Sequence, residues 1–395
     1  MPSPELCLSS RPFSAIAAPI DTEVAKWLDS ATTGDSESAF QLGVLLHRRE
    51  EARARSAPTA QAEEGKAAAA QVLKEIKEEK LAARKAKKER FQLPKAAAVV
   101  TVTSSKDTWQ YWIRKAARTG HSTALVYLGN QLLHGKVDAL SNESENIAEA
   151  AACYEKAATA DPPHVDALFN LGTLYFSGAE DSKGAKVIPA DVGRSFEYFS
   201  EAAARGDVGA QYWVGHCLLS GEGGAHAVNV HQGIDLLKKA AEKAHPAALY
   251  YLATVYRSGL AADTAGLAVP ADRKSFLTYL EMAVAANEAD ALFCMADLYL
   301  QGLEGYPLDE RKALFYLELA AELQHADAIT SLGAMHYSGR GGLPADKRRA
   351  FELYNQAGEL GSQQAWRNLA SMHFTGDGVP QSEEIAREIL KHLKD

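Results

Sequence analysis

A pattern of small and large apolar residues returns along this chain at helical spacing. In its fullest form an alanine is followed after four residues by Leu-Gly, after eight by Tyr and after eleven by Gly, as from Ala167 to Gly178. Residues three to four apart lie on one face of a helix, and glycine commonly ends one. The pattern therefore predicts one helix with a small, apolar face in each copy. The opening alanines are Ala124, Ala167, Ala210, Ala248, Ala291, Ala328 and Ala365.

A second apolar stretch follows each of these helices, after a loop that often contains Pro-x-Asp. Asp191, Asp272 and Asp309 stand where this second stretch begins, and aspartate is a favoured cap for a helix start. The stretch carries an aromatic residue and then paired alanines, such as Ala202 and Ala203, which let two helices approach closely. The opening alanines are 37 to 43 residues apart, which leaves room for one helix pair per copy. We therefore expect helix pairs that stack on their neighbours.

The marks Ala-x-x-x-Leu-Gly-x-x-Tyr-x-x-Gly and Ala-Ala-x-x-Gly resemble the repeats of the Sel1-like family, which is related to the tetratricopeptide repeats. The resemblance covers 121–395. It implies an all-α protein, a right-handed α/α superhelical solenoid of about seven to eight helix-pair repeats. It also implies no catalytic residues and no cofactor, with a protein or peptide as the partner. We therefore predict a non-catalytic scaffold or adaptor for protein–protein interaction, an assembly factor being one such role.

The region before this solenoid reads as one further repeat that is split by an insertion. Ala39 and Gly43 repeat the first-helix marks, whereas second-helix marks return only at Trp109. The expected divisions are an N-terminal segment 1–33, a split first repeat 34–120 with its insertion at about 48–105, and the solenoid 121–395.

Charge separates the insertion from the rest of the chain. The whole sequence has a formal net charge of −9, which opposes general nucleic-acid binding. Between Arg48 and Lys95, however, 14 Lys and Arg residues stand against 8 Asp and Glu residues. This segment is either a solvated loop or a contact to RNA, an acidic partner or an anionic membrane, and an RNA-associated repeat protein is the alternative function. Its basic patch consists of Lys80, Arg84, Lys85, Lys87, Lys88 and Arg90.

The N-terminal segment carries a mixed targeting signal. Residues 6–15 are rich in Ser and small residues and include Arg11, which resembles the end of a mitochondrial presequence, yet Glu5 interrupts it. No apolar run reaches the roughly 18 residues of a membrane span. The 4 cysteines lie far apart, which fits a reducing compartment. We expect a mitochondrial or cytoplasmic protein that is not secreted.

A search for reactive groups finds no metal-ligand spacing and no nucleophile motif. Binding is the better-supported chemistry, because four consecutive repeats carry an aromatic residue two positions before the Leu-Gly mark. First helices line the concave face of such a solenoid, so these rings predict a stripe that grips a peptide. Alternatively, the rings only pack between neighbouring first helices. The candidate residues are Phe169, Thr173, Phe176, Tyr212, His216, Tyr250, Arg257, Phe293 and Asp297.

Overall fold

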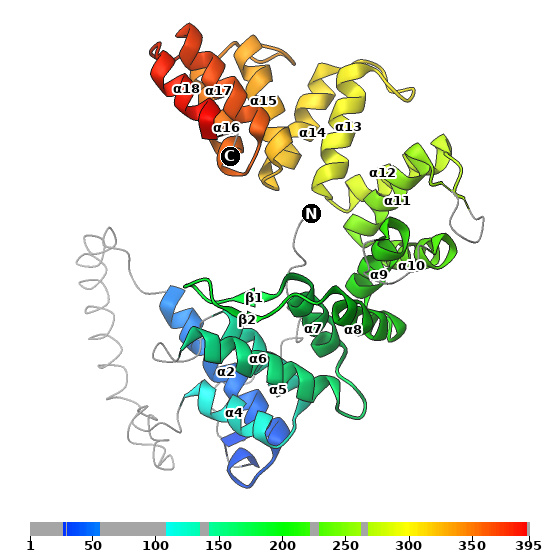
Figure 1. The fold of residues 1–395 in the computed structure, drawn as a ribbon, viewed down its shortest axis with the longest axis vertical. Helices are drawn as coiled ribbons and strands as arrows, with labels where there is room; N and C mark the ends of the chain where they lie inside the picture. The colour runs from blue at the N-terminus through cyan, green and yellow to red at the C-terminus, as the bar shows by residue number, and fades with distance from the viewer. Residues whose placement is uncertain are drawn as a thin grey trace, which may run out of the picture. The chain divides into compact units, whose positions relative to one another are not determined.

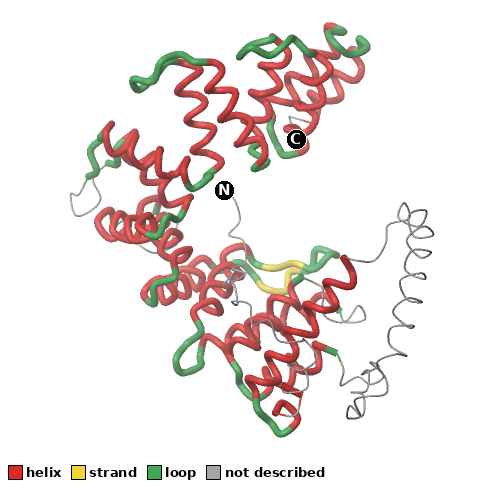
Figure 2. Tube along the Cα trace, turned by 180° about the vertical axis from the view of Figure 1, so that it is seen from behind, coloured by secondary structure: helices red, strands yellow, loops and turns green. Residues whose placement is uncertain are grey.

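The computed structural model describes residues 27–28, 30–55, 108–134, 142–221, 229–261 and 268–392. These ranges are almost entirely helical, with one short antiparallel hairpin, β1 (Ala179–Glu180) and β2 (Lys186–Ile188), in which Ala179 pairs with Ile188 (Figure 2). The chain divides into two compact units, residues 1–190 and residues 191–395. The all-α prediction is confirmed, and the two units are described separately below.

Unit 1 is a stack of helices in which each helix packs on the next one along the chain. The helix α2 packs against α4, although more than fifty residues separate them in the sequence. This is the pairing expected of the split repeat, and α2 continues into the beginning of the predicted insertion. The helices are α2 (Ser36–Arg55), α4 (Trp109–Arg118), α5 (Ser122–Leu133), α6 (Glu143–Ala158) and α7 (Val165–Ser177).

Unit 2 continues the same architecture with five helix pairs after a leading helix, α8, that packs on α9 (Figure 1). The odd-numbered member of each pair is a first helix, which carries the Leu-Gly mark or its variant. The helices are α8 (Val192–Ala204), α9 (Val208–Ser220), α10 (Val230–Glu242), α11 (Pro246–Ser258), α12 (Arg273–Ala285), α13 (Ala289–Gln301), α14 (Glu310–Glu322), α15 (Ala326–Ser338), α16 (Lys347–Glu359), α17 (Gln363–Thr375) and α18 (Glu383–His392).

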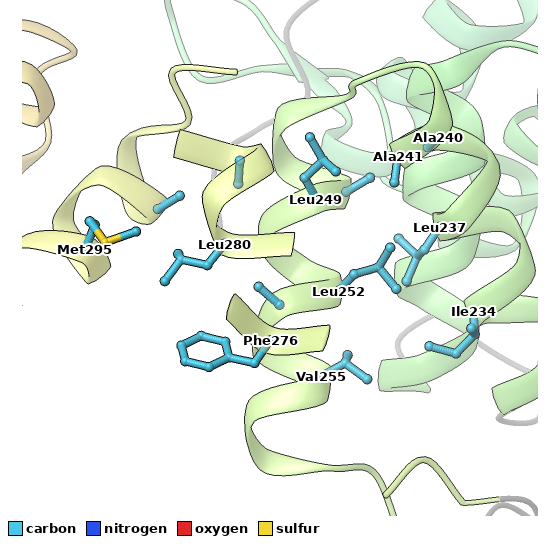
Figure 3. Close-up of a cluster of buried hydrophobic side chains, with 14 of the residues drawn as sticks. Ile234, Leu237, Ala240, Ala241, Leu249, Leu252, Val255, Phe276, Leu280 and Met295 are labelled. Carbon is cyan, nitrogen blue, oxygen red and sulfur yellow. The ribbon is translucent and has the colours of Figure 1, made fainter. Parts of the chain in front are cut away.

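The Leu-Gly mark is the place where the two helices of one repeat touch. A Cβ atom added at Gly215 of α9 would lie 2.8 Å from Leu237 Cγ of α10. The same construction at Gly333 of α15 would meet the Tyr354 ring of α16 at 2.7 Å. Ala253 takes this position in α11 and is fully buried, so only the smallest side chains are found there. The surrounding core is filled by Leu, Ile, Phe and Ala side chains that the helices bring together (Figure 3).

The second helices begin and the first helices end as the sequence predicts. Asp272 and Asp309 cap α12 and α14 by accepting hydrogen bonds from backbone amides of the first turn. Gly302 follows α13 with φ at 68°, a left-handed conformation that costs glycine little and other residues more.

In unit 2, loops inside some repeats bond to the second helix of the repeat before them. Glu304, in the α13–α14 loop, accepts a 2.8 Å bond from Arg273 at the start of α12. In the next loop the charges are exchanged, because Arg340 donates to Glu310 at 2.6 Å. These exposed ion pairs link neighbouring repeats at the loop edge of unit 2.

Candidate binding face on the first helices

A polar residue stands at the start of each first helix, three positions before the opening alanine. Its side chain accepts a hydrogen bond from the backbone amide of that alanine in six of the seven helices from α5 to α17, α7 being the exception. For α11 the acceptor is His245 Nδ1, 3.2 Å from the amide nitrogen of Ala248. These cap residues are His121, His164, Asp207, His245, Glu288, His325 and Ser362.

The residue two positions before the Leu-Gly mark contacts the cap of the following repeat. In unit 2 the Tyr212 ring stacks on His245 with centroids 5.1 Å apart. Phe293 stacks on His325 in the same way, at 4.9 Å. Where the repeat has Thr330, its hydroxyl donates instead to Ser362 Oγ at 2.9 Å. We call each of these contacts between neighbouring first helices a joint.

Acidic side chains complete some of the joints. His325 Nδ1 accepts from the Ala328 amide at 3.0 Å, so the ring hydrogen is on Nε2, which lies 2.9 Å from Asp290 Oδ1. Unit 1 repeats the arrangement, since His121 stacks on Phe40 and its Nε2 lies 2.7 Å from Glu37. Each of these histidines thus contacts its own helix, the preceding ring and the preceding acid.

The joint between α11 and α13 has a different chemistry. Glu288 takes the cap position of α13, with Oε2 2.7 Å from the Ala291 amide nitrogen, and follows the repeat that carries Tyr250. Burial raises the pKa of the Glu288 carboxyl, and the hydrogen bond from the Ala291 amide opposes this only in part. This joint therefore contains a half-buried acid where the next joint contains a histidine.

Six of the nine candidate residues lie in unit 2, and the structure brings several of them together. His216 lies 6.1 Å from the Tyr212 ring and 4.7 Å from the ring of Tyr251, which the sequence analysis did not select. Arg257 donates to Cys294 Sγ at 3.8 Å, one residue from Phe293. Tyr212, His216, Tyr250 and Phe293 are all half-buried, so each ring packs in the protein and keeps part of its surface exposed. Rings of α9 and α11 therefore meet at His216 and Tyr251, and Arg257 links α11 to Cys294 of α13.

The remaining candidates are placed differently. Phe169 and Thr173 are buried in unit 1, where the Thr173 hydroxyl donates to the Phe169 carbonyl at 3.1 Å. Phe176 is half-buried in the same helix. Asp297 of α13 accepts a hydrogen bond from Gln301 within its own helix. The basic patch Lys80–Arg90 lies outside the described residues.

Within the described residues no group of three or more His, Cys, Asp or Glu side chains is placed to bind a metal ion. None of the helices in these ranges has the length and apolar character needed to cross a bilayer.

The sequence analysis identified the rings but missed the caps. His245, His325 and Glu288 were not singled out, although each stands three residues before an opening alanine. The signal was available in the sequence, because this position holds only His, Asp, Glu or Ser in all seven repeats. Histidine is not among the common cap residues, and for that reason these positions were not predicted to cap helices.

Stacked helix pairs with an aromatic face define this chain as an α/α repeat protein. The profile of the Sel1 repeat matches residues 122–162, 165–207, 208–245, 289–325, 326–362 and 365–391, more than half of the sequence. The chain therefore belongs to the Sel1 repeat family, as its motifs predicted. Residues 246–288 lie between two matches and form α11 and α12, a helix pair of the same kind.

Solved structures show the same fold. A protective antigen of uropathogenic Escherichia coli strains, displaying an SLR fold, is 19% identical with a TM-score of 0.57, and the match covers 94% of this chain and 64% of that one. This chain thus spans less than two thirds of that antigen. A Sel1 repeat protein from Oxalobacter formigenes is 22% identical with a TM-score of 0.51, over 64% of this chain and 98% of that one. None of the curated proteins matches this sequence.

Proposed function

We propose that this chain is a non-catalytic scaffold that holds a protein or peptide on the first-helix face of α9, α11 and α13. Sel1-repeat proteins generally act as protein-interaction scaffolds. The observation that carries the proposal here is the contiguous set of rings formed by Tyr212, His216 and Tyr251, half-buried on neighbouring first helices. Rings held in place by their own packing bury a large area on binding at a low cost in entropy. Such a scaffold would act as an adaptor or an assembly factor.

The state of the cysteines supports a non-catalytic role. Burial raises the pKa of the Cys153 thiol to about 11 and raises that of Cys294 as well. Nucleophilic cysteines need the opposite shift, since the thiolate is the reactive form.

Affinity capture from native cells followed by mass spectrometry tests the proposal. The informative variant is Tyr212→Ala with Tyr250→Ala, which removes two half-buried rings of the first-helix face. We expect a discrete set of proteins to be captured by the natural chain and lost from this variant. Circular dichroism and the unfolding midpoint show whether the variant keeps its helices.

A matched control removes two large side chains from second helices. Met282 of α12 and Phe315 of α14 are 42% and 55% exposed, so Met282→Ala with Phe315→Ala takes away comparable apolar surface elsewhere. The control should capture the same proteins as the natural chain. If the control loses them and the tyrosine variant keeps them, the binding face is on the second helices and the proposal is wrong.

A further inference from the structure

The first-helix face of α9, α11 and α13 has an uneven charge. Among the residues of these three helices and their caps, the basic side chain with a full charge is Arg257. The acidic ones are Asp207, Glu288, Asp290 and Asp297. Three of these four carboxylates belong to α13 and its cap, so the acidity is concentrated beside the joint between α11 and α13.

The carboxylates next to this joint have structural bonds, and each has further capacity to accept. Glu288 receives the backbone amides of Ala291 and Asp290, and the Asp290 side chain receives the His325 ring on Oδ1. A carboxylate has about four lone-pair directions on its two oxygens, so these bonds leave room for others. Asp290 also keeps 56% of its side chain exposed.

The aromatic rings lie within the electrostatic reach of the same acids. Burial is the main cause that raises the pKa of Tyr212 to about 12, and the charges of Glu288 and Asp290 raise it further. Burial also raises the pKa of Tyr250 on the neighbouring helix; Cys294, Asp290 and Glu288 raise it further, and the charge of Arg257 opposes them. Tyr250 stands two positions before its mark and Glu288 at the following cap, the same register at which Tyr212 stacks on His245 and Phe293 on His325. The tyrosines and the two carboxylates therefore occupy one region of the face.

We propose that this region recognises a basic side chain, arginine above all, in an extended segment of the partner protein. Aromatic faces attract cations, and a guanidinium both stacks on rings and donates paired hydrogen bonds to carboxylates. The inference rests on the scaffold function proposed above and specifies the chemistry of its partner. Acidic and phosphorylated segments are disfavoured by the same charges.

The ring positions of α15 and α17 offer no such arrangement. In α15 the ring position holds Thr330, which is buried and bonded to Ser362. In α17 the position holds Arg367, an exposed cation. The basic side chain is thus expected at α11 and α13 and not further along the unit.

Selection from a random peptide library displayed on phage tests the inference with the full-length chain. Peptides of about twelve residues suffice, since an extended chain covers about 3.3 Å per residue and packed helices stand about 10 Å apart. We expect the selected peptides to be enriched in Arg. The strongest binder is then synthesised with a fluorophore, and its Kd is measured by anisotropy.

The decisive variant is Glu288→Gln with Asp290→Asn. Each substitution keeps an oxygen that accepts the existing hydrogen bond and removes the charge. We expect Kd to rise about tenfold, and a peptide with citrulline in place of its Arg to lose a similar factor without a further loss in the variant. The control, Glu318→Gln with Glu322→Gln, makes the same charge change on exposed positions of α14 and should leave Kd unchanged.

The outcomes separate this inference from the scaffold function. If selected peptides carry no excess of basic residues and bind the charge variant normally, but are lost from Tyr212→Ala with Tyr250→Ala, the scaffold stands and the basic partner is wrong. Equal weakening by the α14 control would also overturn the inference, because it would indicate a general charge effect. If no peptide binds and capture from cells fails as well, the scaffold function itself is contradicted.

Discussion

Two kinds of helix contact in this protein differ in how much they vary. One joins the two helices of a repeat, and the other is the joint between neighbouring first helices. Inside a repeat the contact is uniform, because Gly215, Ala253 and Gly333 all bring a small residue against the second helix. At the joints the chemistry changes from one repeat to the next: ring on histidine, ring beside glutamate, hydroxyl on hydroxyl. The uniform contacts hold the helix pairs together, and the variable joints change the polarity and charge of the first-helix face from one repeat to the next.

Two adjacent joints show what this variation does. At His325 the ring meets Phe293 and Asp290, and both of its nitrogens have hydrogen-bond partners within the joint. At Glu288 the cap is an acid in a half-buried position near Tyr250, where burial raises its pKa. A cap position that needs only a hydrogen-bond acceptor can thus carry either a closed structural contact or a charge available to a partner.

The largest effect is expected inside the repeat. In Gly215→Val the new Cβ would stand 2.8 Å from Leu237 Cγ and 3.0 Å from the Gly233 carbonyl oxygen, so the helices must separate. We expect the free energy of unfolding to fall by about 3 kcal/mol, the upper part of the range for overpacking. Urea unfolding followed by circular dichroism measures it.

Gly193→Ala is the matched control, because a Cβ at this α8 position meets nothing nearer than Asp191 Oδ1 at 3.4 Å. Alanine favours the helix over glycine by up to about 1 kcal/mol, so this variant should be as stable as the natural chain or more so. A Gly215→Val variant as stable as Gly193→Ala would remove the argument for a tight contact inside the repeat.

A joint should contribute less to the free energy of unfolding than the contact inside the repeat. His325→Ala removes the cap of α15 and the ring stacked on Phe293. Loss of a cap costs about 1 kcal/mol and loss of a ring pair about as much, so unfolding should become easier by about 2 kcal/mol.

His325→Asn divides this loss into its parts, since asparagine caps a helix but cannot stack. We expect it to recover about half of the loss. His231→Ala provides the baseline, because its side chain is 72% exposed and pairs with Asp235 in its own helix. A His325→Asn variant as stable as the natural chain would mean that the stack contributes nothing, and equal stabilities of the two His325 variants would mean that the cap contributes nothing.

The fold could be predicted from the sequence because each residue of the repeat motif has one structural role. Gly302 ends a helix, Asp309 begins one, and Gly215 admits a neighbour, so their order along the chain encodes the helix pairs. The hairpin of β1 and β2 was not predicted. Its few residues show no alternating pattern, and its position depends on contacts of its loop with α6, where Ser182 donates its amide hydrogen to Glu143.

The candidate face could be predicted only in part. The ring positions repeat in sequence, so Tyr212 and Phe293 were found, but a ring packed in a joint and a ring offered to a partner have the same sequence pattern. Glu288 and Asp290 resemble ordinary surface acids until the start of α13 is known. Their proximity to rings of the preceding first helices is a property of the stack, which no single repeat contains.

The smallest effect is the pH dependence of stability that His245 causes at the joint between α9 and α11. His245 uses Nδ1 to accept the Ala248 amide, stacks on Tyr212, and is neutral when it does so. Burial lowers its pKa from 6.5, so the unfolded chain takes up a proton more readily than the folded one. The contribution of His245 to stability is complete above about pH 6.5 and is lost as the pH falls through the folded pKa.

His245→Asn isolates this contribution, because asparagine preserves the cap and does not titrate. Carboxylates elsewhere titrate equally in both proteins, so the difference between them isolates the histidine. Between pH 7.5 and 5.5 the natural chain should lose more stability than the variant, by at most about 1.4 kcal/mol per pH unit, the limit for one proton. If the urea midpoints of the natural chain and of His245→Asn change equally with pH over this range, the neutral ring is not required. The joint would then depend on stacking alone.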